Sequence, residues 1–273
     1  MRLGGPVEDV NTIEEWIQAH RDAGYSAVVW RGFPKGQTDE AMEAVRKAGM
    51  VIAEVPAWCN PMSRDEAART EAIAKCRKQL AMAERVGARC CVNIAGSYGP
   101  KWDGPHPDDL TDAAFDQIVQ TTRQIIDAVK PTRTFYTLET MPWMYPDSAD
   151  SYLRLIKAID RKAMAVHFDP VNIINCPSRY FRTDLVLEDA FAKLGPHIRS
   201  CHAKDIILRN NLTVHLDECV PGAGGLDYKV FLAQMARLDP DTTLIMEHMK
   251  MEQFPAAADF IRRTAGQIGV AIP

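Results

Sequence analysis

The chain has 273 residues and a formal net charge of −4 at pH 7, which comes from 32 basic and 36 acidic residues. This length is enough for one large domain, since single α/β barrels often run to about 250 residues. No block of like charge is long enough to predict a nucleic-acid-binding arm or a membrane-binding patch, so we expect neither partner.

The sequence predicts a cytoplasmic protein. No apolar run approaches the roughly 18 residues of a membrane span, and the first residues lack the basic and apolar blocks of a signal peptide. The seven cysteines are scattered without a CxxC pair, so we expect reduced, mostly packed thiols.

Short apolar or β-branched runs alternate with longer stretches of helical periodicity, which is typical of βαβ units around a parallel sheet. In chain order, strands are expected at 2–7, 26–30, 50–56, 88–96, 134–140, 163–169, 198–205 and 242–248. The helices that follow them are expected at 12–24, 38–49, 63–87, 112–130, 148–160, 184–195, 227–239 and 254–269. Ser63 and Glu66 have the spacing of a capping box at the start of the third helix.

Eight strand-helix pairs predict a (β/α)8 TIM barrel of the α/β class, with residues 1–273 as a single domain. An open doubly wound sheet is the alternative, but no GxGxxG follows the first strand to support dinucleotide binding. The pattern is interrupted at 206–226, where alternating residues and a glycine-rich end predict a hairpin or lid.

Acidic and imidazole side chains end four consecutive predicted strands. Glu139, Asp169, His202 and Glu247 are separated by 30, 33 and 45 residues, about one βα repeat each. Because the carboxyl ends of barrel strands meet at one mouth, these groups should converge there. Each residue alone is more often a helix cap or a hydrogen-bonded loop residue, so the prediction depends on the set. Three carboxylates and one imidazole favour Mn²⁺, with Mg²⁺ or Co²⁺ as alternatives.

The chain resembles the xylose isomerase-like TIM barrels, the sugar phosphate isomerases and epimerases, over nearly its whole length. The resemblance is carried by the segments LET with Glu139, HFDPVN with Asp169, CHAKD with His202, PGAGGLDY, and MEH with Glu247. In relatives such as ketose 3-epimerases, hydroxypyruvate isomerase and inosose dehydratase, this order of residues is the metal set. The resemblance also implies a homo-oligomer, a dimer or a tetramer.

By this resemblance, Glu139 and Glu247 both hold one divalent cation and exchange a proton with the substrate from opposite faces. The implied function is a metal-dependent isomerase or epimerase that acts on a keto-sugar or related polyol through an enediolate. The alternative is a lyase or dehydratase on the same scaffold that acts on an inosose or a 3-keto-glycoside. A DNA-repair endonuclease needs a histidine-rich three-zinc cluster, which seven histidines and the charge pattern do not favour.

Six further residues are candidates for substrate binding. Asn172 stands where ketose epimerases often have a histidine, and Arg209 lies one position beyond the basic residue of their pattern. Lys204 and His167 should share the inward faces of their strands, although a pair with Asp205 and a core position are the respective alternatives. Tryptophans that follow predicted strands could stack on a sugar ring, namely Trp102 and Trp143, with Trp30 and Trp58 in similar positions.

Overall fold

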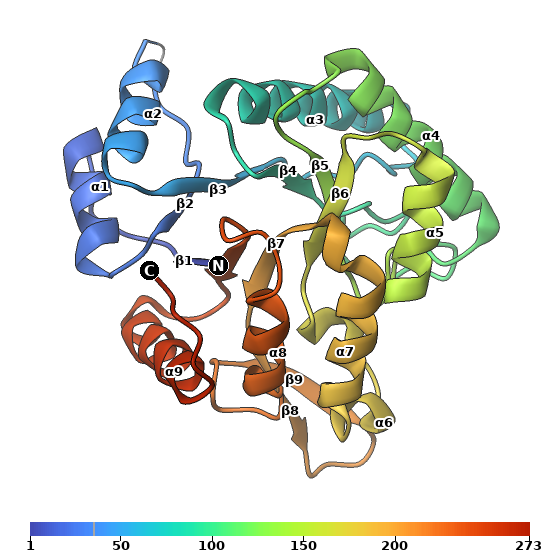
Figure 1. Ribbon diagram of the computed structural model, residues 1–273. Helices are drawn as coiled ribbons and strands as arrows, with labels where there is room; N and C mark the ends of the chain where they lie inside the picture. The colour runs from blue at the N-terminus through green and yellow to red at the C-terminus, as the bar shows by residue number, and fades with distance from the viewer. Residues whose placement is uncertain (35) are drawn as a thin grey trace.

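The computed structural model describes residues 1–34 and 36–273. Eight parallel strands form a closed barrel in the order β1-β10-β7-β6-β5-β4-β3-β2 (Figure 1). The predicted (β/α)8 barrel is therefore confirmed. The barrel strands are β1 Arg2–Gly4, β2 Ala27–Val29, β3 Val51–Pro56, β4 Cys90–Asn93, β5 Tyr136–Glu139, β6 Met164–Phe168, β7 Ile198–Ala203 and β10 Thr243–Met246.

Helices surround the barrel (Figure 1). All eight predicted helices are present, and a short extra helix, α6, precedes α7. The α-helices are α1 Ile13–Asp22, α2 Thr38–Lys47, α3 Glu66–Val86, α4 Asp112–Val129, α5 Ala149–Ile159, α6 Pro177–Tyr180, α7 Thr183–Leu194, α8 Tyr228–Met235 and α9 Phe254–Gln267. Three 3₁₀ turns, Val171–Ile173, Gly195–His197 and Met251–Gln253, complete the elements.

The helix starts follow from local capping. The Thr12 side chain accepts a hydrogen bond from the Glu15 backbone, and the Glu15 side chain returns to the Thr12 backbone, so α1 begins in a capping box. The predicted capping box of Ser63 and Glu66 was wrong. The carboxylate of Asp65 caps α3 instead, accepting a hydrogen bond from Ala68 N, because Asp65 lies directly before the first helical residue.

The barrel strands are short apolar runs because both of their faces are covered. Every residue of β5 and β6 is buried, between the filled barrel interior and the surrounding helices. Trp30 belongs to this core: only 4% of its surface is exposed, and its ring packs edge-on against Trp16 and Phe33. It therefore does not wall a substrate pocket.

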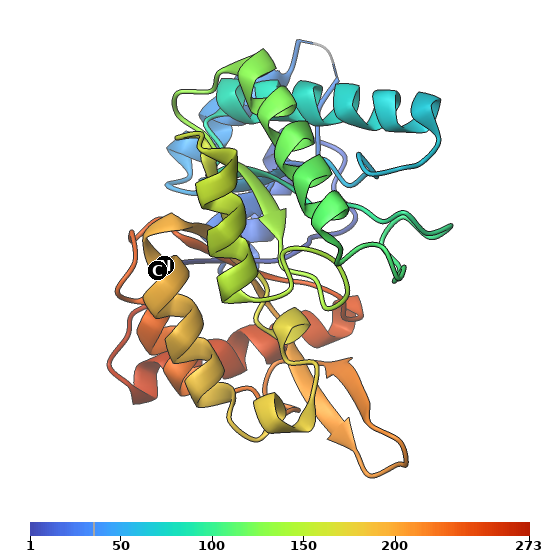
Figure 2. The ribbon, with the colours of Figure 1, turned by 90° about the vertical axis from the view of Figure 1, so that its right-hand side faces the viewer.

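A two-stranded antiparallel hairpin follows β7 and begins one residue before the predicted excursion 206–226. β8 (Asp205–Arg209) pairs with β9 (His215–Cys219), and the hairpin projects from the body of the barrel (Figure 2). One carboxylate, that of Asp205, holds both ends of the excursion. It accepts backbone hydrogen bonds from residues at its start and its end, namely Ile206, Gly222, Gly224 and Leu226.

The two chain termini lie near each other (Figures 1 and 2). β1 pairs with β10, the last barrel strand, and α9 then returns the chain to the same end of the barrel. All seven cysteines are free thiols, as predicted. In the part of the chain that the structure describes, none of the helices combines the length and hydropathy that crossing a bilayer requires.

Candidate metal centre and substrate cavity

The four predicted ligands meet at the carboxyl ends of β5, β6, β7 and β10. The Nδ1 atom of His202 lies 3.0 Å from Glu139 Oε1 and 2.9 Å from Glu247 Oε1. Asp169 Oδ2 lies 3.8 Å from the same nitrogen. The four donor atoms all lie within 4.8 Å of one another, so the arrangement predicted from the strand ends is present.

These distances fit a divalent cation. Two ligand atoms about 2.1 Å from an octahedral ion, at right angles to each other, are about 3 Å apart, as His202 Nδ1 is from each glutamate. Asp169 Oδ2 and Glu247 Oε1 are buried and accept no well-formed hydrogen bond from the described residues. The Lys204 ammonium lies beside both oxygens, but it balances only one of the three negative charges that Glu139, Asp169 and Glu247 can carry. The donor set therefore fits an additional divalent cation.

Lys204 enters the same cluster from the end of β7. Its Nζ atom lies 2.6 Å from Asp169 Oδ2 and 2.8 Å from Glu247 Oε1. A fourth carboxylate, that of Glu218 of β9, lies 3.1 Å from Lys204 Nζ and 3.0 Å from Nδ1 of His248. Glu218 was missed by the sequence analysis, because it comes from the hairpin and not from a barrel strand.

The charges of the cluster shift one another's proton affinities. Burial alone would raise the pKa of Asp169, but the Lys204 ammonium and His202 outweigh it and lower the pKa to about 2. Burial raises the pKa of the Glu139 carboxyl, despite His202 beside it. Burial would lower the pKa of His202, yet the carboxylates of Glu247 and Glu139 raise it well above its usual value. Such opposed shifts are typical of functional sites.

Beneath the cluster lies a buried pair of residues, Glu54 of β3 and His167 of β6. Glu54 Oε2 lies 2.9 Å from Nε2 of His167 and accepts a hydrogen bond of 3.4 Å from the Ser200 hydroxyl. Glu54 Oε1 is 3.8 Å from Nε2 of His202, on the side of that ring away from the metal cluster. His167 is thus a core histidine, and it is not among the residues that line the cavity at the barrel mouth.

A cavity of about 450 Å³ opens above the cluster at the barrel mouth. It holds four of the six predicted substrate contacts, Lys204, Asn172, Trp102 and Trp143, and also Trp58. The remaining lining residues are Ile94, Lys101, Asp103, Glu139, Met141, Pro142, Glu218, Glu247 and His248.

Two predicted contacts are arranged differently from the expectation. The amide nitrogen of Asn172 donates to Glu139 Oε1 at 3.2 Å and to the carbonyl of Thr140 at 2.9 Å, so it orients the glutamate. Arg209 pairs with Asp217 across the hairpin at 2.8 Å and lies outside the cavity. Because side chains alternate between the two faces of β8, the pairing register of the hairpin places Arg209 on the side that faces solvent.

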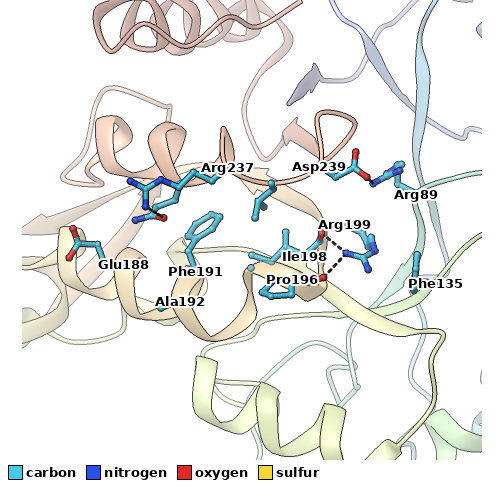
Figure 3. Close-up of a pocket in the computed structure, with 13 residues that line it drawn as sticks. Arg89, Phe135, Glu188, Phe191, Ala192, Pro196, Ile198, Arg199, Arg237 and Asp239 are labelled. Carbon is cyan, nitrogen blue, oxygen red and sulfur yellow. Dashed lines mark hydrogen bonds and ion pairs between the residues drawn. The ribbon is translucent and has the colours of Figure 1, made fainter.

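A larger cavity, of about 790 Å³, lies at the opposite end of the barrel (Figure 3). Two of the three arginines that line it are already paired. Arg199 donates to the carbonyls of Pro196 and Ile198 and stacks on Phe135, and Arg89 pairs with Asp239 at 3.1 Å. In α/β barrels this end contributes to stability, so the cluster of carboxylates and His202, and not cavity size, marks the candidate site.

The profile of the xylose isomerase-like TIM barrel family matches residues 17–264. The chain belongs to this family. No curated protein matches the sequence.

Solved structures share the family fold at low sequence identity. A Mycobacterium smegmatis xylose isomerase-like TIM barrel protein in complex with magnesium is 13% identical, with a TM-score of 0.68, over 94% of this chain and 89% of that one. The probable 3-DHS dehydratase of Bacillus anthracis is 15% identical, with a TM-score of 0.72, over 95% and 96%. The 3-keto-D-glucoside 4-epimerase of E. coli is 15% identical, with a TM-score of 0.68, over 97% and 99%.

Proposed function

We propose that the protein is a divalent-metal-dependent isomerase or epimerase that acts on a keto-sugar. The observation that carries the proposal is the position of two carboxylates at one cavity. Glu139 of β5 and Glu247, which follows β10, both line the cavity and lie within 3.0 Å of His202 Nδ1. Two strands separate β5 from β10 in the barrel, so the carboxylates approach a substrate from different sides.

Glu139, Asp169, His202 and Glu247 would hold the cation, for which Mn²⁺ is our first choice on donor type. When bound, the cation stabilises the negative charge that develops on the substrate oxygens when a neighbouring carbon loses its proton. A protein of the same fold was solved in complex with magnesium, which is consistent with a divalent ion as the cofactor.

The protein's own residues then move the proton. One of the two glutamates removes it from the carbon beside the carbonyl, and the other returns a proton to the opposite face or to the neighbouring carbon. Asn172 holds Glu139 in place through its amide hydrogen bond of 3.2 Å. Lys204 Nζ, directed into the cavity, would bind a substrate oxygen.

Elimination is a second candidate function. Lys204 Nζ lies 2.8 Å from Glu247 Oε1, so an acid stands beside a candidate base. After Glu247 takes the proton, Lys204 could protonate a departing oxygen, which gives a double bond and a released alcohol or water. The fold shared with a probable dehydratase is consistent with this chemistry.

Proton exchange followed by NMR tests both candidates. The Mn²⁺-loaded protein is incubated in D₂O with ketoses, inososes and 3-keto-glycosides, which are recovered before their spectra are recorded. We expect deuterium at one carbon, and its loss in Glu247→Gln. An epimer or isomer as product supports the first function, whereas an unsaturated product or a released alcohol supports the second. No exchange with any substrate contradicts both.

A further inference from the structure

The cavity at the barrel mouth has two chemically different zones. Its floor is charged and consists of Glu139, Glu247, Lys204 and Glu218. Its outer wall is largely apolar and includes two tryptophans from the loops that follow β4 and β5, Trp102 and Trp143, together with Met141 and Pro142. The proposed reaction at a keto group uses only the charged residues of the floor. The apolar outer wall therefore needs a separate explanation.

Trp102 and Trp143 are unusually exposed for such large side chains, at 36% and 38%. Flexible loops do not account for this exposure, because their loops are tied together. The indole nitrogen of Trp143 donates to the carbonyl of Asp103 at 2.9 Å, and the Tyr145 hydroxyl donates to that of Leu110 at 3.2 Å. The two rings are therefore preorganised at the cavity entrance, which lowers the entropic cost of binding.

The first of these loops, which runs from β4 to α4, is also closed by hydrogen bonds between its own two ends. The buried carboxylate of Asp109 accepts hydrogen bonds from the Ser97 hydroxyl at 2.6 Å and from the Tyr98 backbone at 2.9 Å. Trp102 lies between these anchor points, in a turn closed by the Gly104 amide and the Lys101 carbonyl. A well-ordered loop that holds an indole ring at the cavity is typical of a ligand-binding surface.

The charges of the lining residues argue against a phosphorylated substrate. Among the described residues, each lining cation already has an acidic partner: Lys101 lies 3.3 Å from Asp103, and His248 lies 3.0 Å from Glu218. Lys204 is surrounded by carboxylates. A phosphate dianion in the cavity would meet more carboxylates than free cations.

We propose that Trp102 and Trp143 form an outer subsite that stacks on a second ring of the substrate. The substrate is then an uncharged keto-glycoside, with the keto ring at the acidic floor and the other ring against the indoles. This inference rests on the proposed function for the placement of the keto ring. Indole faces suit a sugar or aryl ring, because they offer a large flat apolar area.

Calorimetric affinity for a matched pair of ligands tests the subsite. The ligands are 3-keto-glucose, with one ring, and 3-keto-cellobiose, with two, titrated into the Mn²⁺-loaded protein. We expect the two-ring ligand to bind at least tenfold more tightly. Trp102→Ala and Trp143→Ala should each weaken its binding about threefold to tenfold and leave the one-ring affinity within about twofold.

Phe181→Ala is the matched control, because Phe181 is an aromatic residue with 69% exposure that does not line the cavity. It should change neither affinity. Fructose 6-phosphate should bind no more tightly than fructose. The subsite would be overturned if the wild-type protein bound the one-ring and the two-ring ligand with equal affinity. It would also be overturned if the tryptophan variants lost the same factor of affinity for both ligands.

Binding and turnover separate this inference from the proposed function. A two-ring preference that depends on both tryptophans, without deuterium exchange on either ligand, supports the subsite and contradicts the isomerase. Exchange on the one-ring ligand, without a two-ring preference, supports the isomerase and overturns the subsite. Absence of binding by both ligands contradicts both.

Discussion

The carboxylate of Glu54 lies 2.9 Å from Nε2 of His167, and the pair is fully enclosed beneath the metal cluster. The other Glu54 oxygen faces Nε2 of His202 at 3.8 Å, whereas Nδ1 of His202 faces the predicted ligands. A carboxylate on this side favours the proton on Nε2, which leaves Nδ1 free to coordinate.

Glu54→Gln should therefore weaken Mn²⁺ binding about 10-fold to 100-fold, since a neutral amide does not favour that tautomer. Isothermal titration calorimetry of the metal-free protein measures the change. Ser200→Ala, which removes only the hydroxyl beside Glu54, is the control and should change the affinity by much less. Unchanged affinity in Glu54→Gln would show that the carboxylate does not influence His202.

Divalent metal should stabilise the folded protein, because the assembled ligand set exists only in the native state. At a free metal concentration of 100 times Kd, the gain is about 2.7 kcal/mol, which corresponds to a Tm increase of about 5–10 °C. Differential scanning calorimetry with Mn²⁺ and with EDTA measures it. Asp169→Asn should abolish most of the increase.

The control for Asp169→Asn is Asp109→Asn, because Asp109 is also a buried carboxylate but lies outside the cluster. This variant should lower Tm through its lost loop contacts and keep the increase caused by metal. A metal-dependent increase of the same size in Asp169→Asn would remove Asp169 from the ligand set.

His20 should make the protein less stable in mild acid. Its ring is buried, with Nδ1 donating to the Trp16 carbonyl at 2.7 Å, and burial lowers its pKa below 6.5 despite that hydrogen bond. The unfolded chain therefore binds a proton on His20 at a higher pH than the native chain. The stability contributed by this residue is present above about pH 6.5 and is lost as the pH falls toward the native pKa.

His20→Gln keeps a side-chain donor and cannot titrate. The free energy of unfolding, measured by urea titration between pH 7.5 and 5, should fall less steeply in this variant than in the wild-type protein. Identical slopes for the two proteins would show that His20 titrates alike in the folded and unfolded chain.

Gly224 should be essential to the hairpin. A Cβ atom at this position would lie 2.3 Å from the Ile206 carbonyl oxygen and 2.4 Å from Asp205 Oδ1. Gly224→Ala should therefore displace the end of the excursion and increase proteolytic cleavage in 206–226, with loss of activity through Glu218. Gly266→Ala, where a Cβ meets nothing within 4 Å, is the matched control and should leave the cleavage rate unchanged.

The sequence was sufficient to predict the barrel and the convergence of four acidic and imidazole side chains, because parallel barrel strands deliver their last residues to one mouth. Glu139, Asp169, His202 and Glu247 each follow this rule, so their positions in the chain determine their positions in space. Trp30 also follows a strand, but it turns into the helix layer and packs on Trp16. Strand position does not specify which way a residue in the following loop turns.

The hairpin could be predicted as an irregular segment but not in its contacts. Its pairing register, Leu208 with Leu216 and Arg209 with His215, directs Arg209 toward Asp217 and brings Glu218 to Lys204. A shift of one residue would reverse these faces, and the alternating pattern alone does not specify the register. His167 was expected on an inward face and lies there, but one layer deeper than the cavity, against Glu54.

The hydrogen bonds of Asp205 make the hairpin a structurally separate segment. Because its carboxylate accepts hydrogen bonds at both ends of the excursion, from Ile206 and from Leu226, the chain leaves β7 and returns to α8 at almost the same point. The segment between these two points is an insertion that Asp205 closes at its base. Its strands, β8 and β9, are not part of the closed barrel. Replacement of residues 207–221 by the corresponding segment of a relative should thus change substrate selectivity without moving the barrel strands that carry the candidate ligands. The scaffold can therefore diversify through this one segment.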